Sequence, residues 1–237
     1  VGRMEWDRRV RAARDMGWLA RPTAMSELAV AVRRGMLGGR RPFRGEVGRM
    51  GEAMAIGVPL PATVDWRNHW GRNWMSPVRH QGPCGSCYVF GTVAVAEAVY
   101  RIEHADPDAS VDFSEQLLLS CEPTGNCQDG GWSSHVLDYM KEQGTAQESC
   151  FPYRALDLPC SPCGLWQEGQ DRIRVYDWAW ISDDSERREA VMRALQEGPV
   201  TAYMTVYDDF YDYGGGVYRK TADASEEGGH IVALIGY

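Results

Sequence analysis

The sequence predicts an α+β protein in which a mostly helical half precedes a sheet-rich half. Helical spacing and capping residues dominate residues 84–144, whereas alternating or β-branched runs dominate from Ile173 onward. The 237 residues, 44% of them hydrophobic and nine of them Trp, are enough for one or two domains with a packed core. No apolar run approaches the ~18 residues that a membrane-spanning helix needs. We therefore expect a soluble protein without a membrane partner.

Residues 1–60 form a basic leader that precedes an acidic body. The leader carries 12 Arg, no Lys and 6 acidic residues, a balance of +6, whereas residues 61–237 have a balance of −14. Residues 22–35 predict one short amphipathic helix with Ser26 as its cap, and frequent Gly and Pro up to Pro61 predict extended chain. The arginines lack the interleaved aromatic residues of a base-stacking surface, so we expect no nucleic-acid partner. A leader that lies against its own acidic body is favoured.

Three helices are expected in the first half of the body. Phe90 to Ala105 is apolar at helical spacing, which places Cys87 in the first turn of a long, nearly buried helix. Ser114 is a capping residue for a short helix through Leu119. The third helix is expected over 132–143, ending at the glycine that follows.

The second half predicts strands and one further helix. The run IRVYDWAWI from Ile173 has the pattern of a strand, and a helix is expected from Ser185 to Glu197 behind an acidic cap. Strands are also expected in GPVTAYMTV, GGGVYRK and HIVALIGY, joined by Gly-rich or Asp-rich turns.

The chain contains seven cysteines, and an odd number leaves one thiol free if the others pair. We expect an oxidising compartment, secreted, periplasmic or lysosome-like, with reduced cysteines in a cytosolic protein as the alternative. No signal peptide is visible, but the chain opens on Val1 rather than Met, so such a segment can lie outside it.

The stretch QGPCGSCYVF places Cys84 and Cys87 three positions apart. A zinc site with His80 is disfavoured, because no second Cys or His pair completes four ligands, and no metal is expected. A thioredoxin-like redox pair is disfavoured because the preceding residues do not form a strand. The remaining hypothesis is that Cys87 is a nucleophile, because a helix N-terminus favours its thiolate, and that Cys84 is half of a disulfide.

This stretch resembles the active-site segment of the papain-like cysteine peptidases, and His230 follows Cys87 by 143 residues. Further motifs match in order over residues 60–237: LPATVDWR, SEQLLLSC, CQDGGW, CFPY, GPV, YDDFYDYGGGVY and GGHIVALIGY. Several of them are most similar to cathepsin B. The occluding loop that makes cathepsin B a dipeptide remover has no counterpart between Cys150 and Trp166. Endopeptidase behaviour is therefore expected.

The resemblance implies a two-lobed fold with a V-shaped cleft, preceded by a propeptide over residues 1–60. The body, 61–237, would divide into a helical lobe at about 61–165 and an antiparallel sheet or barrel lobe at about 166–237. The implied partners are protein or peptide substrates and the chain's own propeptide, which crosses the cleft backwards as an intramolecular inhibitor. The resemblance further implies a monomer without a cofactor. The hypothesis that fits is a zymogen of a cysteine endopeptidase.

The family's site residues carry over to matching positions. Cys87 would be the nucleophile, His230 its general base and acid, and Gln81 a side-chain donor to the oxyanion beside the backbone N–H of Cys87. The implied substrate-binding residues are Gly85, Gly130, Gly131, Trp132, Tyr203, Gly228 and Gly229, with Trp132, Tyr203 and Gly228 lining the pocket for the second residue before the cut. The implied disulfides are Cys84–Cys127, Cys121–Cys160 and Cys150–Cys163, one of fifteen possible sets.

The chain also departs from the family pattern. Tyr88 stands where a Trp is usual, and one extra residue lies between Cys127 and the glycine pair. The chain stops at Tyr237, before the Asn-Ser-Trp-Gly segment that orients the imidazole, so a fragment that lacks the last strands and has weak or no turnover is expected. The alternative is a non-catalytic relative that binds peptides, but the presence of Cys87, His230 and Gln81 favours the enzyme.

Overall fold

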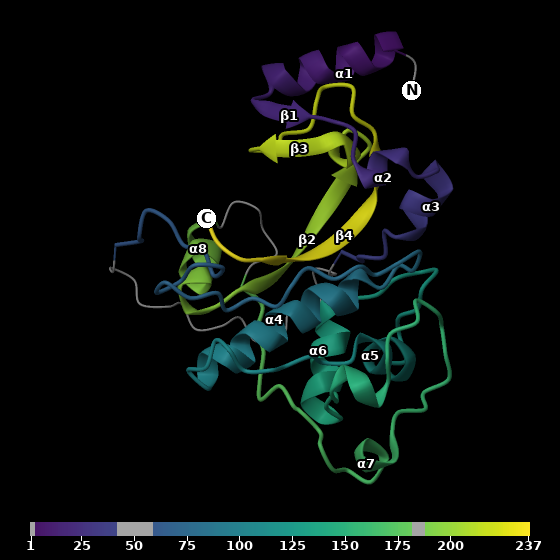
Figure 1. Cartoon of the computed structure of the whole chain (residues 1–237), viewed down its shortest axis with the longest axis vertical. Coiled ribbons are helices and arrows are strands. Elements are labelled where there is room, and N and C mark those ends of the chain that lie inside the picture. The colour runs from purple at the N-terminus through teal and green to yellow at the C-terminus, as the bar shows by residue number, and fades with distance from the viewer. Residues whose placement is uncertain (1–2, 42–58, 182–187) are drawn as a thin grey trace.

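The computed structural model describes residues 3–41, 59–181 and 188–237. Its helical half contains α4 (Cys87–Glu103), α5 (Glu115–Cys121), α6 (Ser133–Glu142), the 3-10 turn η1 (Glu148–Cys150) and α7 (Gly164–Gln167). The rest of the body contains α8 (Arg188–Glu197), β2 (Val200–Tyr207), η2 (Phe210–Asp212), β3 (Tyr213–Gly216) and β4 (Glu226–Leu234). Figure 1 shows α4, α5, α6 and α7 in the lower half of the molecule, with β2 and β4 above them. The α+β class is therefore confirmed.

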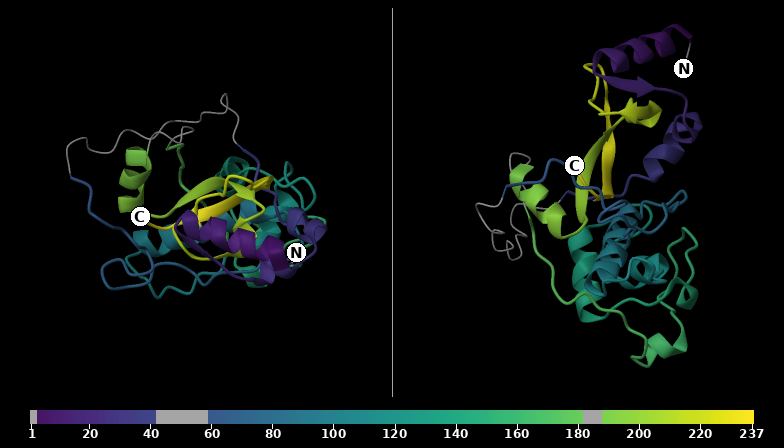
Figure 2. Two further views of the ribbon diagram at one scale, coloured as in Figure 1. Left: turned by 90° about the horizontal axis from the view of Figure 1, so that it is seen from above. Right: turned by 60° about the vertical axis from the view of Figure 1, so that its left-hand side comes forward.

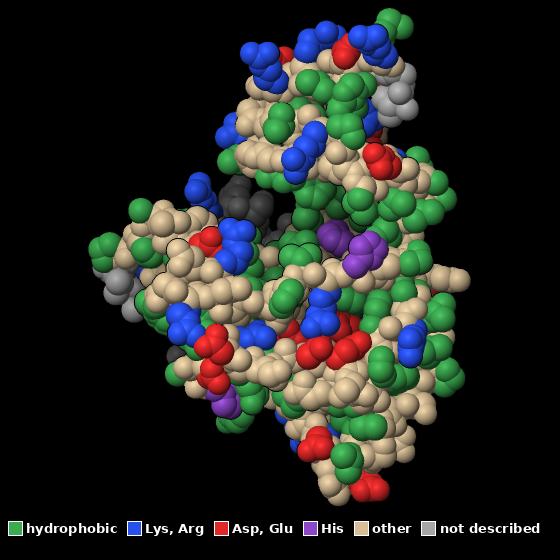
Figure 3. Space-filling view, viewed as in Figure 1, with side chains coloured by type: hydrophobic (Ala, Val, Ile, Leu, Met, Phe, Trp, Pro, Cys, Tyr) green, Lys and Arg blue, Asp and Glu red, His purple; other side chains and the backbone are tan. Residues whose placement is uncertain are grey.

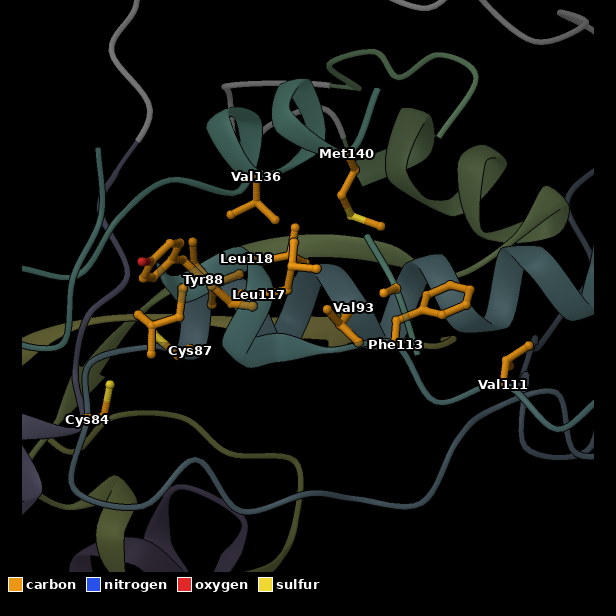
Figure 4. Close-up of a cluster of buried hydrophobic side chains, with 14 of the residues drawn as sticks. Cys84, Cys87, Tyr88, Val93, Val111, Phe113, Leu117, Leu118, Val136 and Met140 are labelled. Atoms are coloured by element: carbon orange, nitrogen blue, oxygen red, sulfur yellow. The ribbon is translucent and has the colours of Figure 1, made fainter. Parts of the chain in front are cut away.

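The helical half is built around α4, whose first turns are buried. Side chains from α5 and α6 pack against it, and Figure 4 shows Leu117, Leu118, Val136 and Met140 converging on Tyr88 and Val93. The cap expected at Ser114 is confirmed, because its hydroxyl accepts a hydrogen bond from the N–H of Leu117 at the start of α5. The three helices expected from local sequence signals are thus confirmed.

Three disulfides close loops of the helical half. They join Cys84 to Cys127, Cys121 to Cys160 and Cys150 to Cys163, the same pairs that the family resemblance implies. Cys87 is left as the free thiol. Three disulfides in one chain are typical of an oxidising compartment.

Strands β2 and β4 pair antiparallel, with Met204 opposite His230 and Tyr203 opposite Ile231. Strand β4 lies against α4, and the glycine at position 91 permits the approach: a Cβ there would lie 3.0 Å from Cγ2 of Ile231. This contact brings the residues around His230 to the N-terminal part of the helix that carries Cys87.

The leader begins with α1 (Arg3–Asp15), β1 (Trp18–Ala20), α2 (Ala24–Glu27) and α3 (Val30–Gly35). Strand β1 pairs antiparallel with β3, and Trp18 packs with Ala13, Tyr213 and Tyr218. Figures 1 and 2 show these leader elements at the end of the molecule opposite the helical half, and Figure 3 shows basic side chains gathered over the outer side of α1. The leader is therefore folded onto the strand-rich part of the body.

The arginines of the leader contact acidic groups of the body, as its charge indicates. Arg9 bonds Asp208 at 2.9 Å and Asp212 at 3.1 Å. Arg34 makes two hydrogen bonds of 2.9 Å to the carboxylate of Glu227. These pairs stabilise the leader most where they are partly buried, because water screens exposed charges.

Some predicted elements are wrong. Residues 22–35 form two short helices rather than one, since Leu28 is extended, and the cap of α2 is Thr23 in a reciprocal pair with Ser26. Residues 173–181 form no strand, only isolated bridges at Ile173, which pairs with Thr145, and at Trp180. A strand needs a partner along its length, and Tyr176 is instead 95% exposed. Helices α1 and α7 and strand β1 were not predicted.

Other boundaries differ by a few residues. The strand expected in GGGVYRK is β3, which ends before Val217. Helix α8 begins at Arg188 within the described part, and the rest of the expected helix, 185–187, lies outside it, as do residues 42–58 of the leader. No helix of the described residues combines the length and the apolar character needed to cross a bilayer.

Candidate active site

Cys87 opens α4, and its side chain is 1% exposed. Burial raises the pKa of this thiol, while backbone N–H groups of Ile231, Gly38 and Tyr88 act in the opposite direction by favouring the thiolate. One of these donors belongs to β4, one to the leader and one to α4 itself. The sulfur therefore lies where three segments of the chain meet.

His230 lies on β4, next to the residue whose N–H faces the Cys87 sulfur. Burial lowers the pKa of its imidazole, which favours the neutral ring. Its Nδ1 atom is buried and has no hydrogen-bond partner among the described residues. Strand β4 thus brings the backbone next to His230 to Cys87, and no group in the described part fixes the tautomer of the ring.

Gln81 uses its side-chain amide twice. Nε2 donates to the carbonyl of Cys84 at 2.7 Å and to the carbonyl of Met36 at 2.8 Å. Met36 belongs to the leader, so the group that the resemblance makes an oxyanion donor is occupied by a leader carbonyl. Both protons of the amide are thus engaged, and none is left for a further carbonyl.

The leader continues from Met36 through the site as an extended segment. Gly131 donates to the carbonyl of Gly38 at 2.8 Å, and its own carbonyl accepts from the N–H of Arg40 at 3.0 Å. Between these bonds, Gly39 donates to the carbonyl of Gly229 at 3.0 Å and forms a parallel bridge with Gly131. The segment 36–40 is thus held from both sides by backbone hydrogen bonds.

Glycine is required on both sides of this contact. A Cβ on Gly38 would overlap the carbonyl of Gly85, and a Cβ on Gly130 would overlap the carbonyl of Gly38. A Cβ on Gly39 would lie 2.8 Å from the carbonyl carbon of His230. Backbone therefore packs against backbone across the whole site, with no room for side chains.

The other expected substrate-binding residues surround the same segment. The guanidinium of Arg40 lies 4.6 Å from the ring centroid of Trp132. Leu37 packs at Gly228, where a Cβ would lie 3.2 Å from its Cδ1. Tyr203 turns its ring toward Gly229, where a Cβ would lie 2.6 Å from the ring. All seven residues named from the sequence thus lie around the leader segment or against a residue that binds it.

The extra residue after Cys127 is absorbed by a turn. The side-chain oxygen of Asn126 accepts from the N–H groups of Gln128 and Asp129, and Asn126 and Gly130 exchange two backbone hydrogen bonds. The disulfide to Cys84 forms with this turn in place. The insertion therefore disturbs neither the bridge nor the pairing of Gly131 with the leader.

Sequence reasoning did not identify several residues of the site. The glycine at 38 had no distinguishing signal among the many glycines of the leader, and the order of contacts along 36–40 depends on the fold. Ser86 and Tyr153 lie within matched motifs, but the sequence assigned them no role. Their hydroxyl groups are hydrogen-bonded to each other, and that of Tyr153 also donates to the carbonyl of Gln81. The one signal in the sequence for Ser86 is that it directly precedes Cys87.

A buried thiol at a helix N-terminus, a histidine on an adjacent strand and an amide donor beside them define the class of thiol hydrolases. Residues 60–237 match the model of the papain family of cysteine proteases. The chain therefore belongs to that family.

Individual cysteine proteases are similar to this chain. The chain is 30% identical over 189 residues to Cysteine proteinase 1 of Entamoeba histolytica, which covers 79% of this chain and 58% of that protein. It is 32% identical over 183 residues to Cathepsin B-like CP3 of Giardia intestinalis, covering 75% of this chain and 59% of that one. The chain thus spans somewhat over half the length of these two relatives.

The fold is also that of a solved proenzyme. The structure of proCathepsin B S9 from Trypanosoma congolense matches with a TM-score of 0.77 at 21% identity, covering all of this chain and 82% of that chain. At this identity the match supports the fold alone. The leader is included in it, since the match covers 100% of this chain.

Proposed function

We propose that this chain is the proenzyme form of a cysteine endopeptidase, with Cys87 as nucleophile and His230 as acid and base. The leader would span residues 1–60, and the catalytic lobes about 61–165 and 166–237. The observation that carries the proposal is that one extended leader segment lies against the Cys87 loop, the Gly130–Gly131 pair and the His230 strand at once. Peptide backbone fits this site, as a protease requires.

The proposed chemistry begins when the Cys87 thiolate attacks the carbonyl carbon of the scissile bond. The carbonyl oxygen becomes an oxyanion, which the Gln81 side chain and the N–H of Cys87 stabilise. Protonated His230 gives its proton to the departing amine, and the C–N bond breaks to leave a thioester on Cys87. His230 then removes a proton from water, which attacks the thioester and releases the carboxylic acid and the thiolate.

The leader would block this chemistry without being cut. The Gln81 amide is bonded to the Met36 carbonyl, whereas the carbonyl of Gly38, whose N–H favours the Cys87 thiolate, is bonded to Gly131. The Gly38 carbonyl is thus not bonded to the oxyanion donor. The parallel pairing with Gly131 is consistent with a leader that runs backwards through the cleft.

The rate at which iodoacetamide alkylates Cys87 at pH 5 tests both the leader contact and the nucleophile. Cys87 is the free thiol of the seven cysteines, so alkylation reports on it alone. The unaltered chain should react slowly because the thiol is buried under the leader. Gly38→Ala should expel the segment and react at least about tenfold faster if the thiol becomes an accessible thiolate. Gly35→Ala is the matched control, because a Cβ at Gly35 meets nothing within 4 Å.

The outcome also separates the enzyme from a peptide-binding relative. In the Gly38→Ala chain, an added His230→Ala change should abolish rapid alkylation at pH 5, since the imidazolium would no longer stabilise the thiolate. The binding alternative gains support from Nδ1 of His230, which has no hydrogen-bond partner within the described residues. The binding alternative predicts slow alkylation whose rate increases with pH only as an ordinary thiol ionises. That result would refute the proposal of an enzyme.

Acid would release the leader by protonating its carboxylate partners. The hydrogen bond from Arg34 lowers the pKa of Glu227. A lowered carboxyl pKa means that the contact stabilises the bound leader above the ordinary pKa and loses this effect as pH falls through the lowered value. Glu227→Gln should therefore speed Cys87 alkylation at pH 7, while Glu226→Gln, at the exposed neighbouring position, should not. Equal alkylation rates in the two variants would exclude a role of the Arg34–Glu227 pair in holding the leader.

A further inference from the structure

Tyr153 ends the CFPY motif, and its hydroxyl joins the two segments that flank Cys87. Its Oη atom lies 2.7 Å from the backbone carbonyl oxygen of Gln81 and 2.6 Å from Oγ of Ser86. Its ring packs edge-on against Phe90, with centroids 4.8 Å apart. Tyr153, which lies between η1 and α7, therefore connects the loop of Gln81 to the start of α4.

The directions of these two hydrogen bonds follow from the donors available. A carbonyl oxygen only accepts, so the single proton of Tyr153 is donated to Gln81. The Ser86 hydroxyl must then donate its own proton to Tyr153 Oη. Burial raises the pKa of Tyr153 to about 12, so its hydroxyl keeps the proton that this arrangement needs.

The bond to Ser86 matters because Ser86 is the N-cap residue of α4. A serine at this position ordinarily accepts a hydrogen bond from an N–H of the first helical turn. Here Ser86 makes no side-chain cap, and its backbone at φ −85° and ψ 14° lies outside the extended region used by capping residues. The proposed mechanism assigns the N–H of Cys87, in this first turn, to the oxyanion. The hydroxyl that could compete for first-turn donors is held by Tyr153.

The bond to Gln81 matters because it anchors the backbone of the residue whose amide is the second donor. The side chain of Gln81 is fixed by the Cys84 carbonyl, and its backbone is fixed by Tyr153. A movement of the backbone at Gln81 would carry the amide with it.

We propose that Tyr153 is a positioning residue of the oxyanion-binding site, holding the Gln81 amide and the uncapped first turn of α4 in register through one hydroxyl group. This inference rests on the proposed function. It assigns no contact of Tyr153 with substrate, and its effect should appear only where an oxyanion forms.

The test compares two probes on the Gly38→Ala chain with and without Tyr153→Phe. A peptidyl aldehyde adds the Cys87 sulfur to its carbonyl carbon, giving a hemithioacetal whose oxygen occupies the oxyanion site. Iodoacetamide forms a C–S bond and releases iodide, with no oxyanion. Tyr153→Phe should weaken aldehyde binding at least about tenfold and change the alkylation rate and its pH profile by less than about twofold.

Two further variants make the outcome decisive. Ser86→Ala should weaken aldehyde binding in the same direction, because it removes the second bond of the same hydroxyl. Tyr176→Phe, at a position 95% exposed, should leave both probes unchanged. Equal losses with both probes would indicate general damage and overturn the proposal, as would an unchanged aldehyde affinity. A Gly38→Ala parent that is alkylated only as an ordinary thiol, or that binds no aldehyde, refutes the proposed function itself.

Discussion

Replacing Glu115 by Gln should change how the stability of the protein depends on pH. Glu115 follows the cap of α5, is 2% exposed, and lies 4.0 Å from Nε of Arg79. Burial raises the pKa of its carboxyl group from 4.5 to about 8. Burial also raises the pKa values of Glu97 and Glu148. The helical lobe thus contains carboxyl groups that favour the protonated form.

The sign follows from proton binding. Between pH 4.5 and 8 the folded chain keeps the Glu115 proton that the unfolded chain has lost, so the free energy of unfolding falls as pH rises. One proton changes this free energy by about 1.4 kcal/mol per pH unit, which gives a loss of about 2.5 kcal/mol between pH 5 and pH 7. Glu115→Gln removes this titration and should flatten the curve by that amount.

The assay is urea unfolding followed by circular dichroism at several pH values, with the disulfides intact. Glu142→Gln is the control, because Glu142 ends α6 at an exposed position and the same substitution there should leave the slope unchanged. If the parent chain and Glu115→Gln have parallel curves between pH 5 and pH 7, the buried carboxyl is not the cause. A parent stability that rises with pH over this range would refute the sign.

Three further substitutions test the packing of the site. Tyr88→Phe should leave thermal stability equal or raise it by about 1 kcal/mol, because the Tyr88 hydroxyl is buried without a partner in the described part of the chain; a clear loss would reveal a hidden bond. Changing Cys84 and Cys127 together to Ala opens a loop of sequence separation 43 and should cost about 4 kcal/mol in urea unfolding, and a negligible cost would contradict the loop-entropy argument. Gly91→Val should destabilise the protein by roughly 2 kcal/mol, since its side chain would press on Ile231; an unchanged midpoint would show that β4 can move away from α4.

Elements specified by local signals could be predicted from the sequence, and elements specified by a distant partner could not. Helix α5 starts where Ser114 can cap it, so its position needs no knowledge of the rest of the fold. Strand β1 has three residues and exists because β3 pairs with it. The run from Ile173 has the composition of a strand but pairs only through isolated bridges, and it remains irregular.

The candidate site follows the same division. Cys87 could be placed at a helix start because the cysteine and the helical pattern are adjacent in sequence. The approach of His230 depends on the register of β2 with β4 and on the close contact of β4 with Gly91, neither of which local pattern determines. The family resemblance supplied that juxtaposition, and the role of Tyr153 required the hydrogen bonds themselves.

The glycines of the site and of the leader differ in what their substitution should do. Gly130 lacks a side chain so that the leader backbone can approach, and under the proposed function a substrate would approach in the same way. Gly38 belongs only to the leader. A Gly130→Ala change should therefore release the leader and also weaken the binding of a peptidyl aldehyde, whereas Gly38→Ala should release the leader and leave aldehyde affinity intact. If both variants bound the aldehyde equally well, Gly130 would contact the leader alone, and the leader segment could no longer serve as a guide to where substrate lies.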